Sequence, residues 1–307
     1  MGIKFNNILI KWWMLIVLVL LIVNCSDDIL EFKVVDSFPV FDPPIIRVDS
    51  IRKTGYTVVN RLSFEGNSLR AQGMAISDSV MYRFFTSGVC QTYDITDIDN
   101  PVLIASFKLG SFDKSNHSNS AQFYVDQNGE KLLYLSGMGG KCYVERISNN
   151  SSELIQTITL DKISYLRNSV RVNTICGDDG YLWLFGIDTN GDMLVFARAR
   201  RPFPCCQEAR ITNNDILDYW YKEDYKFSES LSQGGKVYNG NLFFVFGSQK
   251  TDRHIDFYNV FSHQMVYSVD LNQIISEEPE DCDVIANNLI ITVDGGKGYY
   301  VLNLVEQ

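Results

Sequence analysis

Polar side chains with the capacity for catalysis or ligand binding stand at similar places along this sequence, each near the start of an apolar segment. Five acidic residues lie between positions 277 and 283, and His117 is one of three histidines. A histidine and a carboxylate, such as His117 and Glu280, are the residue types that transfer protons in general acid–base catalysis. Amide and carboxylate side chains hydrogen-bond polar ligands. The candidate ligand-binding residues are Gln72, His117, Asn119, Asn173, Gln233, Glu280 and Asp283.

The sequence lacks the signatures of common cofactor and metal sites. Three histidines and no Cys-x-x-Cys spacing leave zinc without a ligand set. No Gly-x-Ser-x-Gly, phosphate-binding loop or dinucleotide fingerprint is present. The oxygen atoms of Glu280, Asn119 and Asn173 could hold a hard cation such as Ca²⁺, but no contiguous loop motif supports this site. We therefore expect no cofactor and no metal, with Ca²⁺ as the alternative.

A recurring segment indicates which elements position these side chains. It consists of a turn, an apolar and aromatic strand, and often a glycine. The apolar runs begin at positions 80, 132, 181, 241 and 289, so their spacings are 52, 49, 60 and 48 residues. An alternating strand follows each run, and a fourth strand follows in at least three units, at 102–109, 154–160 and 265–271. Such spacings, with four strands in each unit, are typical of the blades of a β-propeller.

The repeats predict an all-β fold, a β-propeller of five blades. The last unit lacks its outer strand, whereas the domain opens with an unassigned alternating strand, Tyr56 to Phe64. Pairing this N-terminal strand with the last unit would close the ring and remove exposed strand edges. Six blades is the alternative, because the 60-residue spacing covers positions 210–227, where a reduced blade could lie. A long outer strand and loop in blade three would explain the same spacing.

The innermost strands of a propeller line a central channel, so polar groups at their starts converge on one opening. This opening is either a ligand pocket or a structural channel filled with water. Glycoside hydrolysis is disfavoured, because it needs two carboxylates about 5 to 10 Å apart and the inner-strand acids gather in the last blade. Gln72 and Gln233 occupy the matching places in blades one and four.

The N-terminus has the pattern of an export signal. Lys4 and Lys11 precede an unbroken apolar run over positions 12–23, which is too short for a stable membrane-spanning helix but suits a signal-peptide core. Positions 21–25, LIVNC, resemble a lipobox, where a signal peptidase cleaves before a lipid-modified cysteine. We expect residues 1–24 to be removed and Cys25 to carry the lipid. An uncleaved signal anchor is the alternative.

The residues after Cys25 predict the location of the protein. Ser26, followed by two aspartates, resembles the acidic sorting stretch of surface-displayed lipoproteins in some Gram-negative bacteria. Acyl chains would hold the protein at the membrane without a transmembrane segment. Residues 25–50 contain three prolines and are interpreted as the lipidated cysteine and an extended tether, with the propeller domain at 51–307. We expect an outer-membrane or cell-surface location.

The net charge argues against nucleic acid as a partner. The formal charge is −10, and the segment from Cys25 onward carries −12, because Lys4 and Lys11 are the only charged residues before it. Such an acidic surface repels phosphate backbones. The expected partners are the membrane, through the lipid anchor, and a glycan, peptide or protein.

Six cysteines follow Cys25. In an oxidising envelope they allow fifteen pairings, among which the sequence does not choose. The adjacent Cys205 and Cys206 could form a strained vicinal disulfide, pair separately, or remain free. Most of the six fit buried thiols.

Three short segments carry a resemblance to known proteins: QGMA at 72–75, NHSNSAQF at 116–123, and EPED at 278–281. They resemble β-propeller surface lipoproteins of Gram-negative gut bacteria. A looser similarity is to the five-bladed receptor-binding propellers of phage tails, which also place Gln-Gly and His-containing segments at blade starts. The resemblance covers residues 56–304 and implies the fold, while any function carried over with it is analogy.

The leading functional hypothesis is a non-catalytic, surface-tethered propeller that captures a glycan or peptide, or contacts a protein partner. Tyr219, Trp220, Tyr221 and Tyr225 are candidate exposed rings for stacking on sugars, although packing of an outer strand explains them nearly as well. One alternative is an envelope hydrolase or lyase that uses His117 and Glu280 across the channel. Another is a structural subunit of a surface complex.

Overall fold

The computed structural model divides the chain into two units, Met1–Asp42 and Pro43–Gln307. The residues it describes all belong to the second unit: 43–54, 63–64, 67–113, 116–126, 128–167, 172–191, 193–222, 224–226, 229–294 and 298–306. The expected signal segment and Cys25 lie outside these residues. Within the described part, no helix has the length and apolar character needed to cross a membrane.

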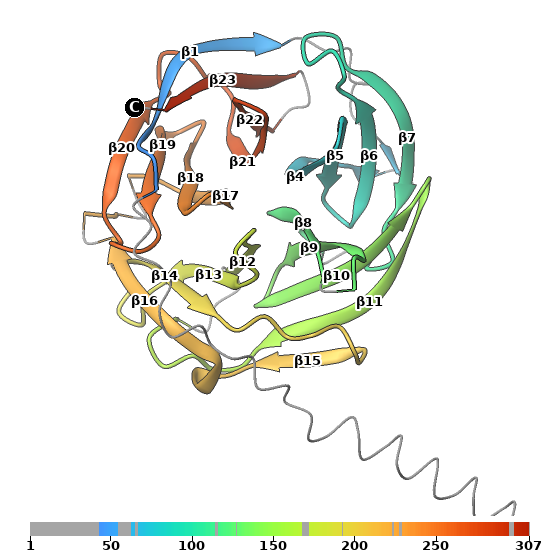
Figure 1. Cartoon of the computed structure of the whole chain (residues 1–307), viewed down its shortest axis with the longest axis vertical. Coiled ribbons are helices and arrows are strands. Elements are labelled where there is room, and N and C mark those ends of the chain that lie inside the picture. The colour runs from blue at the N-terminus through green and yellow to red at the C-terminus, as the bar shows by residue number, and fades with distance from the viewer. Residues whose placement is uncertain are drawn as a thin grey trace, which may run out of the picture. The chain divides into compact units, whose positions relative to one another are not determined.

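Pro43–Gln307 form five antiparallel blades around one axis, as Figure 1 shows. From the axis outward, blade one is β4 (Ala71–Ser77), β5 (Val80–Phe85), β6 (Val89–Asp94) and β7 (Val102–Lys108). Blade two is β8 (Ala121–Val125), β9 (Lys131–Gly137), β10 (Lys141–Ser148) and β11 (Ser151–Leu160). Blade three is β12 (Asn173–Cys176), β13 (Leu182–Ile187), β14 (Leu194–Ala199) and β16 (Ile216–Lys222).

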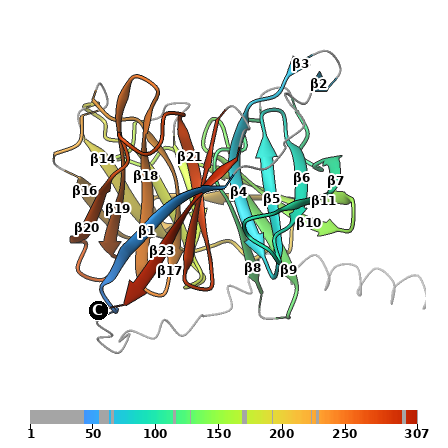
Figure 2. The same cartoon turned by 90° about the horizontal axis from the view of Figure 1, so that it is seen from above.

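Blade four is β17 (Ser232–Tyr238), β18 (Asn241–Ser248), β19 (Thr251–Asn259) and β20 (Met265–Asp270). Blade five is β21 (Pro279–Ile285), β22 (Asn288–Val293), β23 (Tyr299–Glu306) and β1 (Ile46–Thr54). The five-bladed β-propeller predicted from the repeat spacing is therefore confirmed. In the side view of Figure 2, the strands of each blade run between the two faces of the ring.

The apolar runs of the sequence correspond to strands that are buried on both faces. Each blade lies between two others, so its middle strands have no solvent-facing side and need not alternate in polarity. Every residue of β13 is buried, as is nearly all of β18. A separate hydrophobic cluster fills each of the five interfaces between neighbouring blades. Between blades three and four, for example, Phe185 and Phe244 meet edge to face with ring centroids 4.7 Å apart.

The ring is closed by an N-terminal strand, as predicted, but the strand lies earlier in the chain than expected. β1 pairs antiparallel with β23, from Ile46 opposite Glu306 to Thr54 opposite Tyr299. Of the expected closing strand at 56–64, residues 56–62 lie outside the described part, and 63–64 form β2 of a short hairpin with β3 (Asn67–Ser68). β1 begins in the stretch interpreted as tether, because the alternating apolar side chains that follow Pro44 pack against blades four and five.

The 60-residue spacing reflects an extra strand and not a sixth blade. After β14, the chain reaches back to blade two, where β15 (Glu208–Ile211) pairs in parallel with β11 as a fifth strand. A 3-10 helix, η1 (Asn213–Asp215), is capped by the Thr212 side chain and leads into β16, the outer strand of blade three. The segment proposed to hide a reduced blade therefore supplies the edges of two existing blades.

Candidate functional site

The inner strands are tied together across the axis by the carboxylate of Asp281 on β21. Its Oδ2 accepts the backbone N–H groups of Met74 at 3.0 Å and Ala121 at 3.2 Å, while Oδ1 accepts the Ser120 hydroxyl at 3.3 Å. Burial raises the pKa of Asp281, whereas these backbone hydrogen bonds oppose the rise. Asp281 is fully buried, and its hydrogen bonds link blades one, two and five. It is therefore a structural residue.

The Gln-Gly pairs at the starts of β4 and β17 have a steric explanation. The N–H of Gly73 donates to the carbonyl of Ser118 at 2.7 Å, and a Cβ on Gly73 would lie 2.6 Å from that carbonyl oxygen. A Cβ on Gly234 would lie 2.3 Å from Oδ1 of Asp281. The glycines therefore let neighbouring inner strands approach closely at the axis.

A second set of contacts crosses the axis further along the inner strands. Oδ1 of Asp283 pairs with Nζ of Lys236 at 2.8 Å, and its Oδ2 accepts the Ile76 N–H at 2.6 Å. Burial alone would lower the pKa of Lys236, but the charge and hydrogen bond of Asp283 raise it. Nε2 of Gln122 donates to the carbonyl of Gly235 at 3.2 Å. Asp283, a candidate ligand-binding residue, is therefore engaged in a buried ion pair.

The polar groups at the starts of the inner strands form two connected sets. The first joins blades two and three: the His117 ring contacts Oδ1 of Asn119, and Nδ2 of Asn119 donates to Oδ1 of Asn173 at 3.0 Å. The Ser136 hydroxyl also donates to that oxygen, at 3.2 Å. The structure thus brings together three of the predicted ligand-binding residues.

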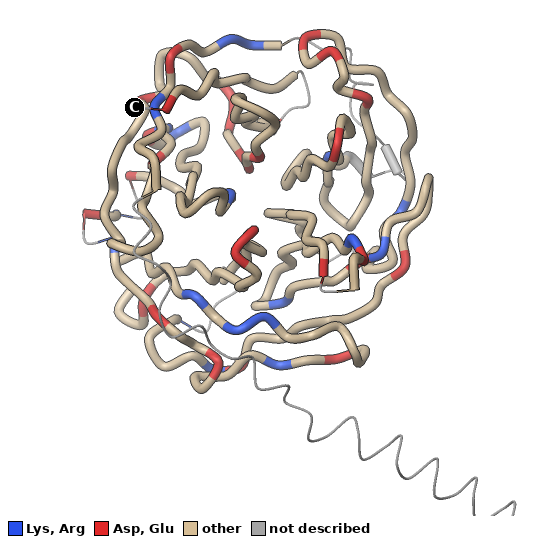
Figure 3. Tube along the Cα trace, viewed as in Figure 1, with Lys and Arg blue, Asp and Glu red and all other residues tan. Residues whose placement is uncertain are grey.

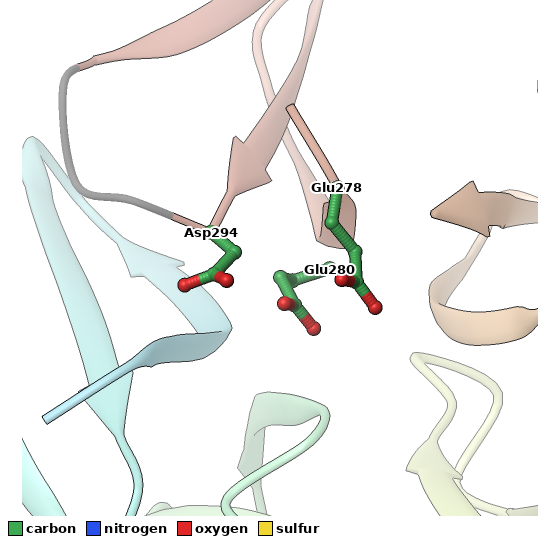
Figure 4. A group of neighbouring side chains, drawn as sticks. All are labelled: Glu278, Glu280 and Asp294. Carbon is green, nitrogen blue, oxygen red and sulfur yellow. The ribbon is translucent and has the colours of Figure 1, made fainter. Parts of the chain in front are cut away.

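The second set is a group of three carboxylates on blade five, Glu278, Glu280 and Asp294, which Figure 4 shows pointing toward the space inside the blades. An oxygen from each lies within 4.8 Å of the others. Arg70 hydrogen-bonds Asp294 and lies 3.5 Å from Glu278. Figure 3 shows acidic residues, in red, on the inner strand of blade five.

Two of the predicted glutamines contact this acidic group. Nε2 of Gln233 donates to Glu278 at 3.0 Å, and Nε2 of Gln72 lies 3.4 Å from Oε1 of Glu280. Burial raises the pKa of Glu280, and the negative charges of Glu278 and Asp294 raise it further. The contact between the Gln72 amide and the Glu280 carboxylate crosses the interface between blades one and five.

The sequence did not single out Arg70 or Asp294 as site residues. Asp294 follows β22, which runs antiparallel to β21, so its backbone returns to the level at which β21 begins. In the sequence, Asp294 is marked only by its place directly after an apolar run. The order of the strands was needed to show that it lies beside the start of β21. Of the Ca²⁺ ligands expected from the sequence, Asn119 and Asn173 hydrogen-bond each other, and Glu280 lies with Glu278 and Asp294.

Three of the four aromatic candidates lie on β16, and the fourth, Tyr225, follows it. Tyr219 and Tyr221 are exposed, whereas Trp220 and Tyr225 are buried between blades three and four. Trp220 stacks on His263 with centroids 4.5 Å apart, and the ring of Tyr219 stacks on Tyr165 at 4.1 Å. The expectation of four exposed rings is thus wrong for Trp220 and Tyr225. Trp220 points to the face of β16 opposite to Tyr219 and Tyr221, because successive side chains of a strand alternate between its faces. Tyr225 follows β16 and packs into the hydrophobic cluster between blades three and four.

None of the six cysteines of the described residues forms a disulfide. Cys90, Cys142, Cys176 and Cys282 are buried, and Cys205 and Cys206 are exposed. Burial raises the pKa of the Cys142 and Cys176 thiols to about 12. For Cys205 and Cys206, the structure shows neither a vicinal disulfide nor separate disulfides.

Solved structures with a similar fold include carbohydrate-active enzymes. An exo-β-1,3-galactanase from Phanerochaete chrysosporium has a TM-score of 0.50 and 12% identity, over 82% of this chain and 64% of its own. A GH43 β-1,3-galactosidase has a TM-score of 0.50 and 10% identity, over 82% of this chain and 59% of its own.

The tail fibre of a Staphylococcus aureus phage has a TM-score of 0.46 and 15% identity, over 86% of this chain and 53% of its own. This chain therefore spans less than two thirds of the length of each of these three proteins. No protein-family model and no curated protein matches the sequence. At such low identities, the similarity to the two enzymes shows the β-propeller fold and nothing about activity.

Proposed function

We propose that this protein is a lipid-anchored binding propeller of the bacterial envelope that captures a glycan or peptide where the inner strands begin. One observation carries the proposal. Each of the five blades contributes an amide or carboxylate side chain to this end of the inner strands: Gln72, Asn119, Asn173, Gln233 and Glu280, from blades one to five. Converging hydrogen-bonding groups of this kind fix the orientation of a polar ligand.

Binding is favoured over glycoside hydrolysis by the positions of the acids. A hydrolase needs carboxylates on both sides of the scissile bond, about 5 to 10 Å apart. Here Glu278, Glu280 and Asp294 all come from blade five, with their oxygens within 4.8 Å of one another. The two candidate catalytic residues have different partners, since His117 contacts Asn119 while Glu280 contacts Gln72.

Binding can be tested with the purified protein on arrays of glycans and envelope peptides. The glycan set includes β-1,3-linked galactans, because two similar structures are named for activity on β-1,3-galactosyl linkages. We expect the double variant Asn119→Ala, Asn173→Ala to bind at least about tenfold more weakly, because two polar ligand contacts are lost. Glu208→Gln, on the exposed edge strand β15, should bind like the wild type.

The same samples distinguish the other functions. Release of shortened products from a bound glycan would overturn the non-catalytic proposal in favour of the hydrolase. Absence of binding to every glycan and peptide would favour a structural subunit of a surface complex.

The anchor is tested separately in cells. Radiolabelled palmitate should be incorporated into the wild-type chain and not into a Cys25→Ala variant, because acylation requires the cysteine thiol. Protease treatment of intact cells should then degrade the anchored protein if it faces outward. Equal labelling of both chains would contradict lipidation at Cys25.

A further inference from the structure

The chain enters the propeller at one face of the ring, against the turns of blade four. Pro43, the first residue of the propeller unit, is buried. A Cβ on Gly240, in the turn between β17 and β18, would lie 3.1 Å from the Pro43 side chain and 3.0 Å from the ring of Phe261. Phe261 belongs to the turn between β19 and β20. The entry point of the chain is therefore fixed to this face.

Exposed hydrophobic side chains surround the entry point. They come from the residue before β1, the end of β17, the turn before β20, the start of β20 and the end of β23, and they form the apolar patch: Ile45, Tyr238, Phe261, Met265, Val266 and Val305. The two blades that contribute them are in contact here. Val305 is paired with Arg47 of β1, and the Arg47 guanidinium lies 5.9 Å from the centre of the Tyr267 ring of β20. Contiguous apolar surface of this kind marks a contact with a partner or a membrane.

The apolar patch and the candidate ligand-binding residues lie at opposite faces of the ring. Gln233 stands near the start of β17 and Tyr238 at its end, which places them about 17 Å apart along the strand. Figure 2 shows the beginning of β1 and the C-terminus at one face, and the β2–β3 hairpin, which precedes β4, at the other. Val125, which ends β8 at the same face as the patch, is also exposed. A surface that covers the patch would therefore leave the polar starts of the inner strands accessible.

We propose that the apolar patch rests on the lipid surface of the membrane, so that the starts of the inner strands face away from the bilayer. This inference rests on the proposed lipid anchor at Cys25. Residues 26–42 are all that separates Cys25 from Pro43, and a chain of this length spans at most about 60 Å even when fully extended. Because the chain reaches the propeller beside the patch, the anchor holds the patch at a high effective concentration near the bilayer.

The side chains of the patch suit the boundary between lipid headgroups and acyl chains. Aliphatic side chains and phenylalanine enter this boundary from the apolar side, whereas the amphipathic ring of tyrosine lies at the level of the headgroups. The apolar stem of Arg47 can lie along the patch while its guanidinium reaches a lipid phosphate. The chain has a net charge of −10, which anionic lipids repel. The apolar side chains should therefore make the contact on a zwitterionic bilayer.

The contact can be tested with the mature, lipidated protein in phosphatidylcholine vesicles, with a tryptophan in the patch as the probe. The tryptophans of residues 26–307, Trp183 and Trp220, are both buried. Tyr238→Trp places a further ring in the patch, and Ile274→Trp places one between β20 and β21, at the opposite face. The two positions are matched, since Tyr238 is 39% and Ile274 40% exposed.

We expect bromine atoms on the acyl chains to quench the probe in the patch. The fluorescence of Tyr238→Trp should fall at least about twofold relative to vesicles of ordinary phosphatidylcholine, because side chains at a membrane interface lie about 5 to 10 Å into the boundary. The fluorescence of Ile274→Trp should be the same in both kinds of vesicle. If Tyr238→Trp does not fold, Met265→Trp provides the same measurement from β20.

Flotation of the vesicles separates this inference from the anchor on which it rests. If the protein floats with the vesicles but Tyr238→Trp is quenched no more than Ile274→Trp, the membrane contact is overturned and the anchor stands. Absence of the protein from the floated fraction overturns both. Emission of Tyr238→Trp that moves to shorter wavelength as the protein concentration rises, without quenching by bromine, would overturn the membrane contact and assign the patch to a second copy of this chain.

Discussion

The carboxylate of Asp281, on the inner strand of blade five, accepts the backbone N–H of Met74, on the inner strand of blade one, at 3.0 Å. Both residues are fully buried. The same carboxylate oxygen also accepts the Ala121 N–H of blade two. A side chain therefore makes the hydrogen bonds that tie three inner strands together near the axis.

Replacing Asp281 with alanine should lower the free energy of unfolding by about 2 to 4 kcal/mol, because two buried N–H groups and the Ser120 hydroxyl lose their acceptor. Urea denaturation measures the change. Asp49→Ala is the control, since Asp49 is exposed on β1 and should change stability by less than about 0.5 kcal/mol. Equal stabilities of the two variants would contradict the structural role of Asp281.

Gly73→Ala should destabilise the protein by about 1 to 3 kcal/mol, because the added methyl group would lie 2.6 Å from the Ser118 carbonyl oxygen, a backbone atom that cannot easily move. The comparison is Gly129→Ala, where the new Cβ meets no atom within 4 Å and only the positive φ of 78° opposes the substitution. Thermal unfolding of both variants separates the two effects. A melting temperature for Gly73→Ala equal to that of the wild type would show that the inner strands are further apart than described.

The closure between β1 and blade five should weaken in acid. Lys53 of β1 forms an ion pair with Glu277, whose other oxygen accepts the hydroxyls of Tyr300 and Ser276, each at 2.9 Å. Burial alone would raise the pKa of Glu277, but these bonds lower it from 4.5 to about 2. A lowered pKa in the folded state means that the carboxylate contributes stability above about pH 4.5, and that this contribution is lost as the pH falls toward 2.

Glu277→Gln should therefore cost about 1 kcal/mol at pH 7, a modest value because the Lys53 and Glu277 side chains are 41% and 22% exposed. Its unfolding free energy should also fall less steeply than that of the wild type between pH 5 and pH 2. Urea titrations at several pH values measure both effects. Parallel pH profiles for the two proteins would rule out this pair as a source of the acid sensitivity.

The thiols should react in two classes. Iodoacetamide alkylates thiolates, and buried thiols such as Cys142 and Cys176, with pKa values of about 12, are both inaccessible and protonated at pH 8. Peptide mass spectrometry of the native protein should find Cys205 and Cys206 modified within minutes. Cys90, Cys142, Cys176 and Cys282 should react only after unfolding. Protection of Cys205 and Cys206 that disappears on reduction would instead reveal a disulfide.

The blade count could be predicted from the sequence because a blade is a local unit. The apolar runs at 80, 132, 181, 241 and 289 lie within one residue of the starts of β5, β9, β13, β18 and β22. Middle strands are buried on both faces, so they appear in the sequence as continuous apolar runs. The segments on either side of them do not have this pattern. The closing strand was placed too late, since β1 and the segment after it both alternate, and only the pairing with β23 separates them.

The sequence by itself determined the fold class, the five repeats and the polar residues at the starts of the inner strands, because these depend on patterns within about 50 residues. Tertiary structure decided which of those polar residues meet. Asp281 and Asp283 are occupied by buried partners, while Glu280 is joined by Asp294 from the end of the next strand. The physical reason is that hydrogen bonds across the axis join residues up to about 200 positions apart, such as Gln72 and Glu280, so no local pattern records them.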